Sequence, residues 1–107
     1  MSVVASAISG GKVTVAGATR PKIYNIAIPL ANTEYSHTLS DDVLKFSIKL
    51  RGAANLRIAF VAGETATNYF TVPAGCTFSE SDLRLASCTL YFSVDKASQV
   101  LEILEWT

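Results

Sequence analysis

Strict alternation of apolar and polar residues is the clearest pattern in the middle of the chain. Over residues 43–51 every second residue is apolar, and most of the residues between them are polar or basic. A period of two is that of a β-strand with one buried face, so we expect a half-buried strand here. Its expected inner face comprises Leu44, Phe46, Ile48 and Leu50, and its outer face Lys45, Ser47, Lys49 and Arg51.

The same alternation resumes after a short break. Gly52 interrupts the first strand, and Leu56, Ile58 and Phe60 again occupy every second position. Short loops of a few residues commonly join two antiparallel neighbours. We therefore predict a hairpin turn over residues 52–55.

Several further segments carry shorter β patterns, bounded by glycine, proline or polar turn residues. They cover residues 12–16, 22–30, 35–39, 69–72, 76–78, 90–94 and 100–106. Residues 81–84 have the capping chemistry of a single helical turn. Eight or nine short strands without a long helical pattern indicate an all-β fold, an antiparallel β-sandwich that is jelly-roll-like.

The final segment differs from the other predicted strands because both of its faces are apolar. Leu101 and Ile103 share one face, whereas Val100, Leu104 and Trp106 share the other. This is typical of a strand covered on both sides, although a helix is the structural alternative. We expect Trp106 to be tethered or to contact a partner.

Residues 1–19 differ in composition from the sandwich domain predicted over residues 20–107. They are small or β-branched residues with Lys12 as the only charge and no aromatic ring. Either they form a first hairpin, or they are an arm that becomes ordered against a neighbouring subunit. We favour the arm, because weakly packed terminal segments are usually loose until tied down.

Charge is balanced overall but divided unevenly along the 107 residues. Residues 1–57 have a formal charge of +4 and residues 58–107 a charge of −4. Either copies dock through opposite patches, or the fold interleaves the two halves and the asymmetry disappears. Nucleic acid is a poor candidate partner, because basic residues are few and are not interleaved with aromatics. We expect neither a membrane span nor a secretion signal.

Catalytic and metal-binding templates are incomplete in this sequence. His37, the only histidine, lies near Ser36, Ser40, Asp41 and Asp42, but a triad is defined by geometry, and we interpret His37 as a partly exposed strand residue. Cys76 and Cys88 are too few for a zinc site. They could form a disulfide across neighbouring strands, but without a secretion signal we favour buried free thiols. Without a glycine-rich phosphate loop either, we predict no cofactor, no metal and no enzymatic activity.

Aromatic residues supply the remaining functional signal. Those expected to be exposed are Tyr24, Tyr35, Tyr69, Tyr91 and Trp106. Flat rings of this kind either form a platform for glycans or fill contacts between subunits, where aromatics are enriched. The sequence leaves both uses open.

Four segments together resemble small virion proteins of tailed bacteriophages. They are residues 31–39, 70–75, 90–92 and 100–106, and the likeness extends over residues 22–107. The resemblance implies a jelly-roll-like subunit that decorates or cements the capsid surface, or one that sits at the neck or tail. It also implies the major capsid protein and further copies of the chain as partners, and it carries over no catalytic residues. A carbohydrate- or receptor-binding module of a tail or fibre is the alternative.

The expected interface combines the N-terminal segment, the basic face of the alternating strand and the exposed aromatic or apolar positions. Its candidate residues are Val13, Val15, Lys45, Lys49, Arg51, Tyr91, Leu104 and Trp106.

Overall fold

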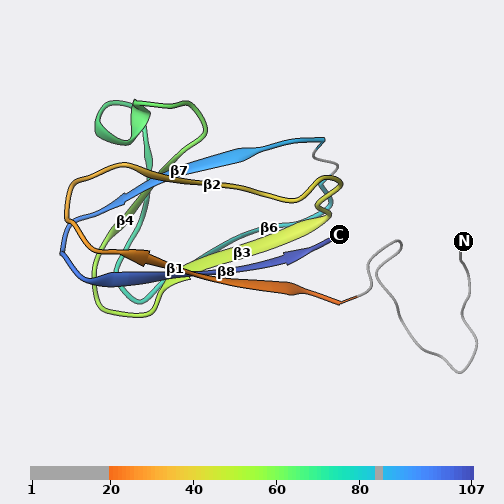
Figure 1. Ribbon diagram of the computed structural model, residues 1–107, viewed down its shortest axis with the longest axis horizontal. Coiled ribbons are helices and arrows are strands. Elements are labelled where there is room, and N and C mark those ends of the chain that lie inside the picture. The colour runs from red at the N-terminus through yellow and green to blue at the C-terminus, as the bar shows by residue number, and fades with distance from the viewer. Residues whose placement is uncertain (1–19, 84–85) are drawn as a thin grey trace, which may run out of the picture.

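The computed structural model describes residues 20–83 and 86–107, so the arm and the strand predicted within residues 1–19 lie outside the described residues. The described part forms two packed layers of antiparallel strands (Figure 1). The strands are β1 (Lys22–Ile28), β2 (Tyr35–Thr38), β3 (Lys45–Leu50), β4 (Leu56–Ala59), β5 (Phe70–Val72), β6 (Thr77–Glu80), β7 (Thr89–Val94) and β8 (Gln99–Trp106).

Strands that follow one another in sequence mostly lie in opposite sheets. The first sheet has the order β1-β8-β3-β6, and the second has the order β2-β7-β4-β5. Only β4 and β5 are both consecutive in the chain and paired with each other. This wrapping of eight strands into two sheets is that of a jelly roll. The prediction of an all-β, jelly-roll-like sandwich is therefore confirmed.

The hairpin predicted over residues 52–55 is wrong. β3 pairs with β6 and β8, whereas β4 pairs with β5 and β7, so residues 52–55 carry the chain from one sheet to the other. Alternation shows which face of each strand is buried but not which strand lies beside it. Two strands with equally apolar faces pack across the core here, and Ala54 is buried at the crossing.

The core lies between the inner faces of the two sheets. Its large buried side chains include Ile28, Phe46, Ile48, Leu56, Ile58, Leu90, Phe92, Val94, Leu101 and Ile103. Two positions of the predicted pattern are shifted. Val43 rather than Leu44 is fully buried ahead of β3, and Phe60 is 52% exposed because β4 ends at Ala59.

β8 is a strand, as preferred over a helix, and it lies between β1 and β3. Leu101, Ile103 and Glu105 face the core, while Glu102, Leu104 and Trp106 alternate with them and are half-buried. The expectation that both faces are covered is thus met on one side only. On the other side, within the described residues, side chains of the flanking strands give partial cover.

The loop over residues 60–69 covers part of the outer face of the second sheet. It contains the short 3-10 helix η2 (Glu64–Ala66), which lies against β4 and β7 (Figure 1). Ala59 and Ser93 alternate with core residues on these strands and yet are only 3% and 4% exposed. The two sheets therefore differ, because the outer face of the second is partly covered by its own chain.

The helical turn predicted over residues 81–84 is not present in its described part, residues 81–83. Asp82 has a positive φ of 57°, which a regular helical turn does not allow. The capping chemistry of this segment instead belongs to an irregular loop after β6.

Candidate functional site

Five of the eight candidate interface residues lie on one surface, the outer face of the first sheet. Lys45 and Lys49 project outward from β3, and Arg51 follows directly after that strand. Leu104 and Trp106 lie on the same side of β8. The register pairs Lys45 with Trp106 and Lys49 with Glu102, so the basic and apolar positions interleave. We call this surface the outer face of the first sheet throughout.

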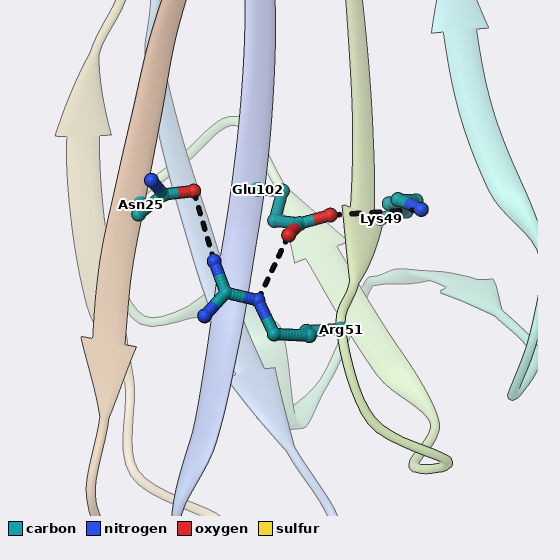
Figure 2. Close-up of polar contacts among 4 residues, drawn as sticks. All are labelled: Asn25, Lys49, Arg51 and Glu102. Atoms are coloured by element: carbon teal, nitrogen blue, oxygen red, sulfur yellow. Dashed lines mark hydrogen bonds and ion pairs between the residues drawn. The ribbon is translucent and has the colours of Figure 1, made fainter.

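A polar network joins three strands across this surface (Figure 2). The Arg51 Nε atom donates to Glu102 Oε2 at 2.8 Å, and Arg51 Nη2 donates to Asn25 Oδ1 at 3.2 Å. The Nζ atom of Lys49 lies 3.6 Å from Glu102 Oε1. Arg51 thus connects the edge strand β1 to the central strand β8, and Glu102 lies between two cations.

These contacts hold the pKa of Glu102 below its ordinary value of 4.5. The hydrogen bond from Arg51 is the main cause, and the charges of Lys49 and Arg51 act in the same direction. Glu102 is therefore ionised at neutral pH and offsets one of the cations around it. With Lys45, Lys49 and Arg51 against this one carboxylate, the described outer face of the first sheet remains net positive.

A groove of about 430 Å³ crosses the outer face of the first sheet. It is lined by Ile23, Asn25, Ser47, Ile48, Lys49, Thr77, Glu102, Ile103 and Leu104. Ile23 is opposite Leu104 in the register, and its side chain is 69% exposed. The lining therefore combines the apolar side chains of Ile23 and Leu104 with the polar side chain of Asn25 and the charged side chains of Lys49 and Glu102.

The two oppositely charged halves of the chain are interleaved in the fold. The first sheet takes β1 and β3 from the basic half and β6 and β8 from the acidic half. Lys49 and Arg51 consequently lie beside Glu102 rather than on a separate patch. Of the two alternatives drawn from the charge split, the structure favours interleaving.

Tyr91 does not join this surface. It lies on β7 in the second sheet, where the register places it between Ser36 and Ala59. Val13 and Val15 lie outside the described residues. The sequence pattern around Tyr91 predicted a strand correctly but did not specify the sheet to which the strand belongs.

The aromatic residues do not form one platform. Tyr24 and Tyr35 pack against the core, and the Tyr35 hydroxyl accepts a hydrogen bond from the Leu30 backbone N–H. The centre of the Tyr69 ring lies 4.8 Å from the guanidinium carbon of Arg57, a residue of β4 in the second sheet. The four tyrosines therefore do not share one surface that could serve the carbohydrate-binding alternative.

A buried polar cluster at one end of the sandwich was missed by the sequence analysis. Glu105 is fully buried and accepts hydrogen bonds from the Tyr24 hydroxyl at 3.2 Å, the Ser40 backbone N–H at 3.3 Å and the Ser40 hydroxyl. Lys22 Nζ donates to Ser40 Oγ at 3.3 Å. The sequence did contain a signal for this burial. Glu105 continues the alternation of Leu101 and Ile103, which places it on the same inner face of the strand.

His37 is half-buried and packs against Tyr24 of this cluster. Its ring lies 4.5 Å from the Tyr24 ring at an angle of 55°, and its Nε2 atom is buried without a hydrogen-bond partner. Burial lowers the pKa of His37, against the opposing effect of the Glu105 charge. The Ser40 hydroxyl is directed to the Glu105 carboxylate, so the arrangement does not present a serine activated by histidine.

Both cysteines have free thiols, but they differ in burial. Cys88 is half-buried against the core, and burial raises its pKa, whereas Cys76 is exposed. The expectation that both are buried is wrong for Cys76, because it lies in the turn after β5.

Within residues 20–83 and 86–107, no three histidine, cysteine or acidic residues gather to hold a metal. No helix in this part is long and apolar enough to cross a membrane.

Comparisons with known proteins give little further information. No family model and no curated protein matches the chain. A solution NMR structure of a de novo designed double-stranded β-helix is similar, with a TM-score of 0.47 and 11% sequence identity. The likeness covers 83% of this chain and 100% of the designed one. A similarity at this level carries no information about function.

Proposed function

We propose that this protein is a non-catalytic structural subunit that decorates or cements the capsid of a tailed bacteriophage. On this proposal it binds the major capsid protein through the outer face of the first sheet. The observation that carries the proposal is the gathering of Lys45, Lys49, Arg51, Leu104 and Trp106 on that one surface. The resemblance of four sequence segments to small virion proteins supplies the biological context.

The composition of the surface supports a protein partner. Exposed Ile23 and half-buried Leu104 provide apolar area whose burial favours association. The cations around them steer and orient a partner more than they add affinity, which suits an acidic surface. Aromatic residues such as Trp106 are also enriched at protein–protein interfaces.

The difference between the two sheets also supports this choice of surface. The loop over residues 60–69 lies on β4 and β7, and its Thr65 is buried. A shell presents many equivalent sites, so one modest contact surface per copy is sufficient when contacts between neighbours add to it. Capsid decoration accordingly requires a rigid sandwich with one free face, and not a catalytic centre.

The first test is the amount of this protein in purified particles of its source phage. Quantitative mass spectrometry should give a copy number comparable with that of the major capsid protein. A small number of copies per particle would assign the protein to the neck, tail or fibre instead. Its absence from clean particles would contradict the virion proposal.

The second test asks whether the outer face of the first sheet is the binding surface. Lys45→Glu reverses one cation on this face, and Arg57→Glu reverses one on the opposite sheet as a matched control. We expect Lys45→Glu to weaken binding to particles stripped of the protein by about tenfold or more, and the control to bind normally. Equal binding by both variants would exclude this surface while leaving the virion location intact.

A further inference from the structure

The four edges of the two sheets are not equivalent. β2, β5 and β6 are edge strands of four, three and four residues, whereas the edge strand β1 has seven. Short edges are one of the ways in which proteins prevent unwanted strand pairing. β1 alone among these edges is long enough to offer an extended row of backbone groups that no described strand pairs.

Among the described residues, β1 also has few of the other protections of an edge strand. Its sequence, KIYNIAI, has one charge, at its first position, and contains neither proline nor glycine. Ile23, Asn25 and Ala27 are exposed on its outer side, and no described residue pairs with its free edge. A long, weakly charged edge of β-prone residues is a template for another strand.

Two prolines define the length of the strand that can be added. Pro21 precedes β1 and Pro29 follows it, and proline has no N–H to donate to a ladder. The pairing window is therefore residues 22–28, whose centre is Asn25. From these features we infer that a second copy of this chain pairs with β1, antiparallel, about a two-fold axis at Asn25.

The sequence of β1 is complementary to itself in this register. Asn25 faces Asn25 of the second copy, Tyr24 faces Ile26, and Ile23 faces Ala27. The one cation, Lys22, faces the apolar Ile28, so no two like charges meet. A two-fold pairing uses the same edge on both copies and closes on itself, and it covers part of the 69% exposed Ile23.

Pairing at β1 extends the first sheet into a continuous sheet of eight strands. The groove on the outer face borders this edge, because Ile23 and Asn25 belong to its wall. The dimer thus places two copies of the groove side by side on one surface. This interface does not depend on the capsid proposal, since it concerns a second copy of the chain alone.

Sedimentation of the full chain tests the dimer directly. One strand pair is a small interface, so we expect a reversible dimer with a dissociation constant of about micromolar to millimolar. A protein that stays monomeric across this range overturns the inference. If it pairs only after residues 1–19 are removed, those residues occupy the edge and the second copy is excluded as its occupant.

Paired charge substitutions test the register. Ile23→Lys with Ala27→Lys places like charges opposite each other across the axis, so dimerisation should weaken about tenfold or more. Ile23→Lys with Ala27→Glu places opposite charges together and should keep the dimer. Thr71→Lys on the exposed edge strand β5 is the control, and circular dichroism verifies folding. A dimer that treats both double variants alike overturns this register.

Disulfide trapping adds a test that does not rely on charge. Facing residues of antiparallel strands have Cα atoms about 4.5–5.5 Å apart, within the range of a disulfide. With Cys76→Ser and Cys88→Ala, the further change Asn25→Cys should give a covalent dimer on oxidation. Thr71→Cys in the same background should not. The reverse result would move the interface to β5 and overturn the inference.

Discussion

The hydroxyl of Tyr24 donates a 3.2 Å hydrogen bond to Oε1 of Glu105, a residue 81 positions further along the chain. Glu105 is fully buried, and a buried carboxylate is costly unless it is hydrogen-bonded. Ser40 supplies two further donors, from its backbone N–H and its hydroxyl. The cluster therefore joins β1, β8 and the connection between β2 and β3 at one end of the sandwich.

Tyr24→Phe removes one donor from this buried carboxylate and keeps the aromatic ring. We expect the free energy of unfolding to fall by about 1–3 kcal/mol, the usual cost of leaving a buried polar group without a hydrogen-bond partner. Urea denaturation measures the change. Tyr91→Phe, on the outer side of the second sheet, should change stability by less than about 0.5 kcal/mol. Equal losses in the two variants would show that the Glu105 contact is not stabilising.

Protonation of His37 should destabilise the fold. Burial lowers the pKa of His37 below its ordinary value of 6.5, so the unfolded chain takes up this proton at a higher pH than the folded protein. Stability from this residue is therefore complete above pH 6.5 and is lost as the pH falls below it.

The test compares denaturation of the wild type and His37→Phe at several pH values on either side of that value. His37→Phe retains a ring against Tyr24 but cannot titrate, so it should lose this part of the pH dependence. An NMR titration of the His37 ring should give a midpoint below 6.5. A midpoint above that value would contradict the predicted direction.

Glu34 should control the order of the loop over residues 60–69. Its Oε2 atom accepts from the Gly63 N–H at 2.9 Å, and its Oε1 atom accepts from the Thr65 hydroxyl at 2.7 Å and the Thr65 N–H at 3.3 Å. The Thr65 hydroxyl is the main cause that lowers the pKa of Glu34 below 4.5. The anchoring contribution is therefore present above pH 4.5 and is lost as the pH falls through the lowered pKa.

Glu34→Ala should accordingly raise amide hydrogen exchange at Gly63 and Thr65 while leaving the core strands protected. Glu64→Ala, in the same loop, is the control, because its side chain makes only a long 3.5 Å contact with Asn68. In the wild type, the Gly63 amide shift should titrate with a midpoint below 4.5. Unchanged exchange in Glu34→Ala would show that the loop is held by its packing alone.

Ile58 and Phe60 provide a test of where the strand pattern ends. Ile58 is buried in the core, whereas Phe60 is 52% exposed beyond the end of β4. Ile58→Ala should lower the free energy of unfolding by about 2–5 kcal/mol, the cost of removing a buried aliphatic side chain. Phe60→Ala should cost less than about 1 kcal/mol, although it removes a larger group. Comparable losses would place Phe60 in the core, as the sequence pattern suggested.

Local alternation was sufficient to predict the strands themselves. The buried positions Phe46, Ile48, Leu101 and Ile103 follow from a period of two, because successive side chains of a strand point to opposite faces. The sandwich class followed from many short strands of this kind. Lys45, Lys49 and Arg51 were likewise predicted on the outer side of their strand, and each of them is exposed and alternates with core residues.

The alternating pattern therefore specifies the strands, most of their buried faces and the class of the fold. Which strands are neighbours is not specified by that pattern, because pairing depends on contacts between segments far apart in the chain. That is why residues 52–55 cross between sheets and why Tyr91 lies opposite the basic face. The burial of Glu105 also depends on tertiary contacts. A carboxylate on a core face is tolerated only where donors reach it, and here Tyr24 and Ser40 donate hydrogen bonds to Glu105.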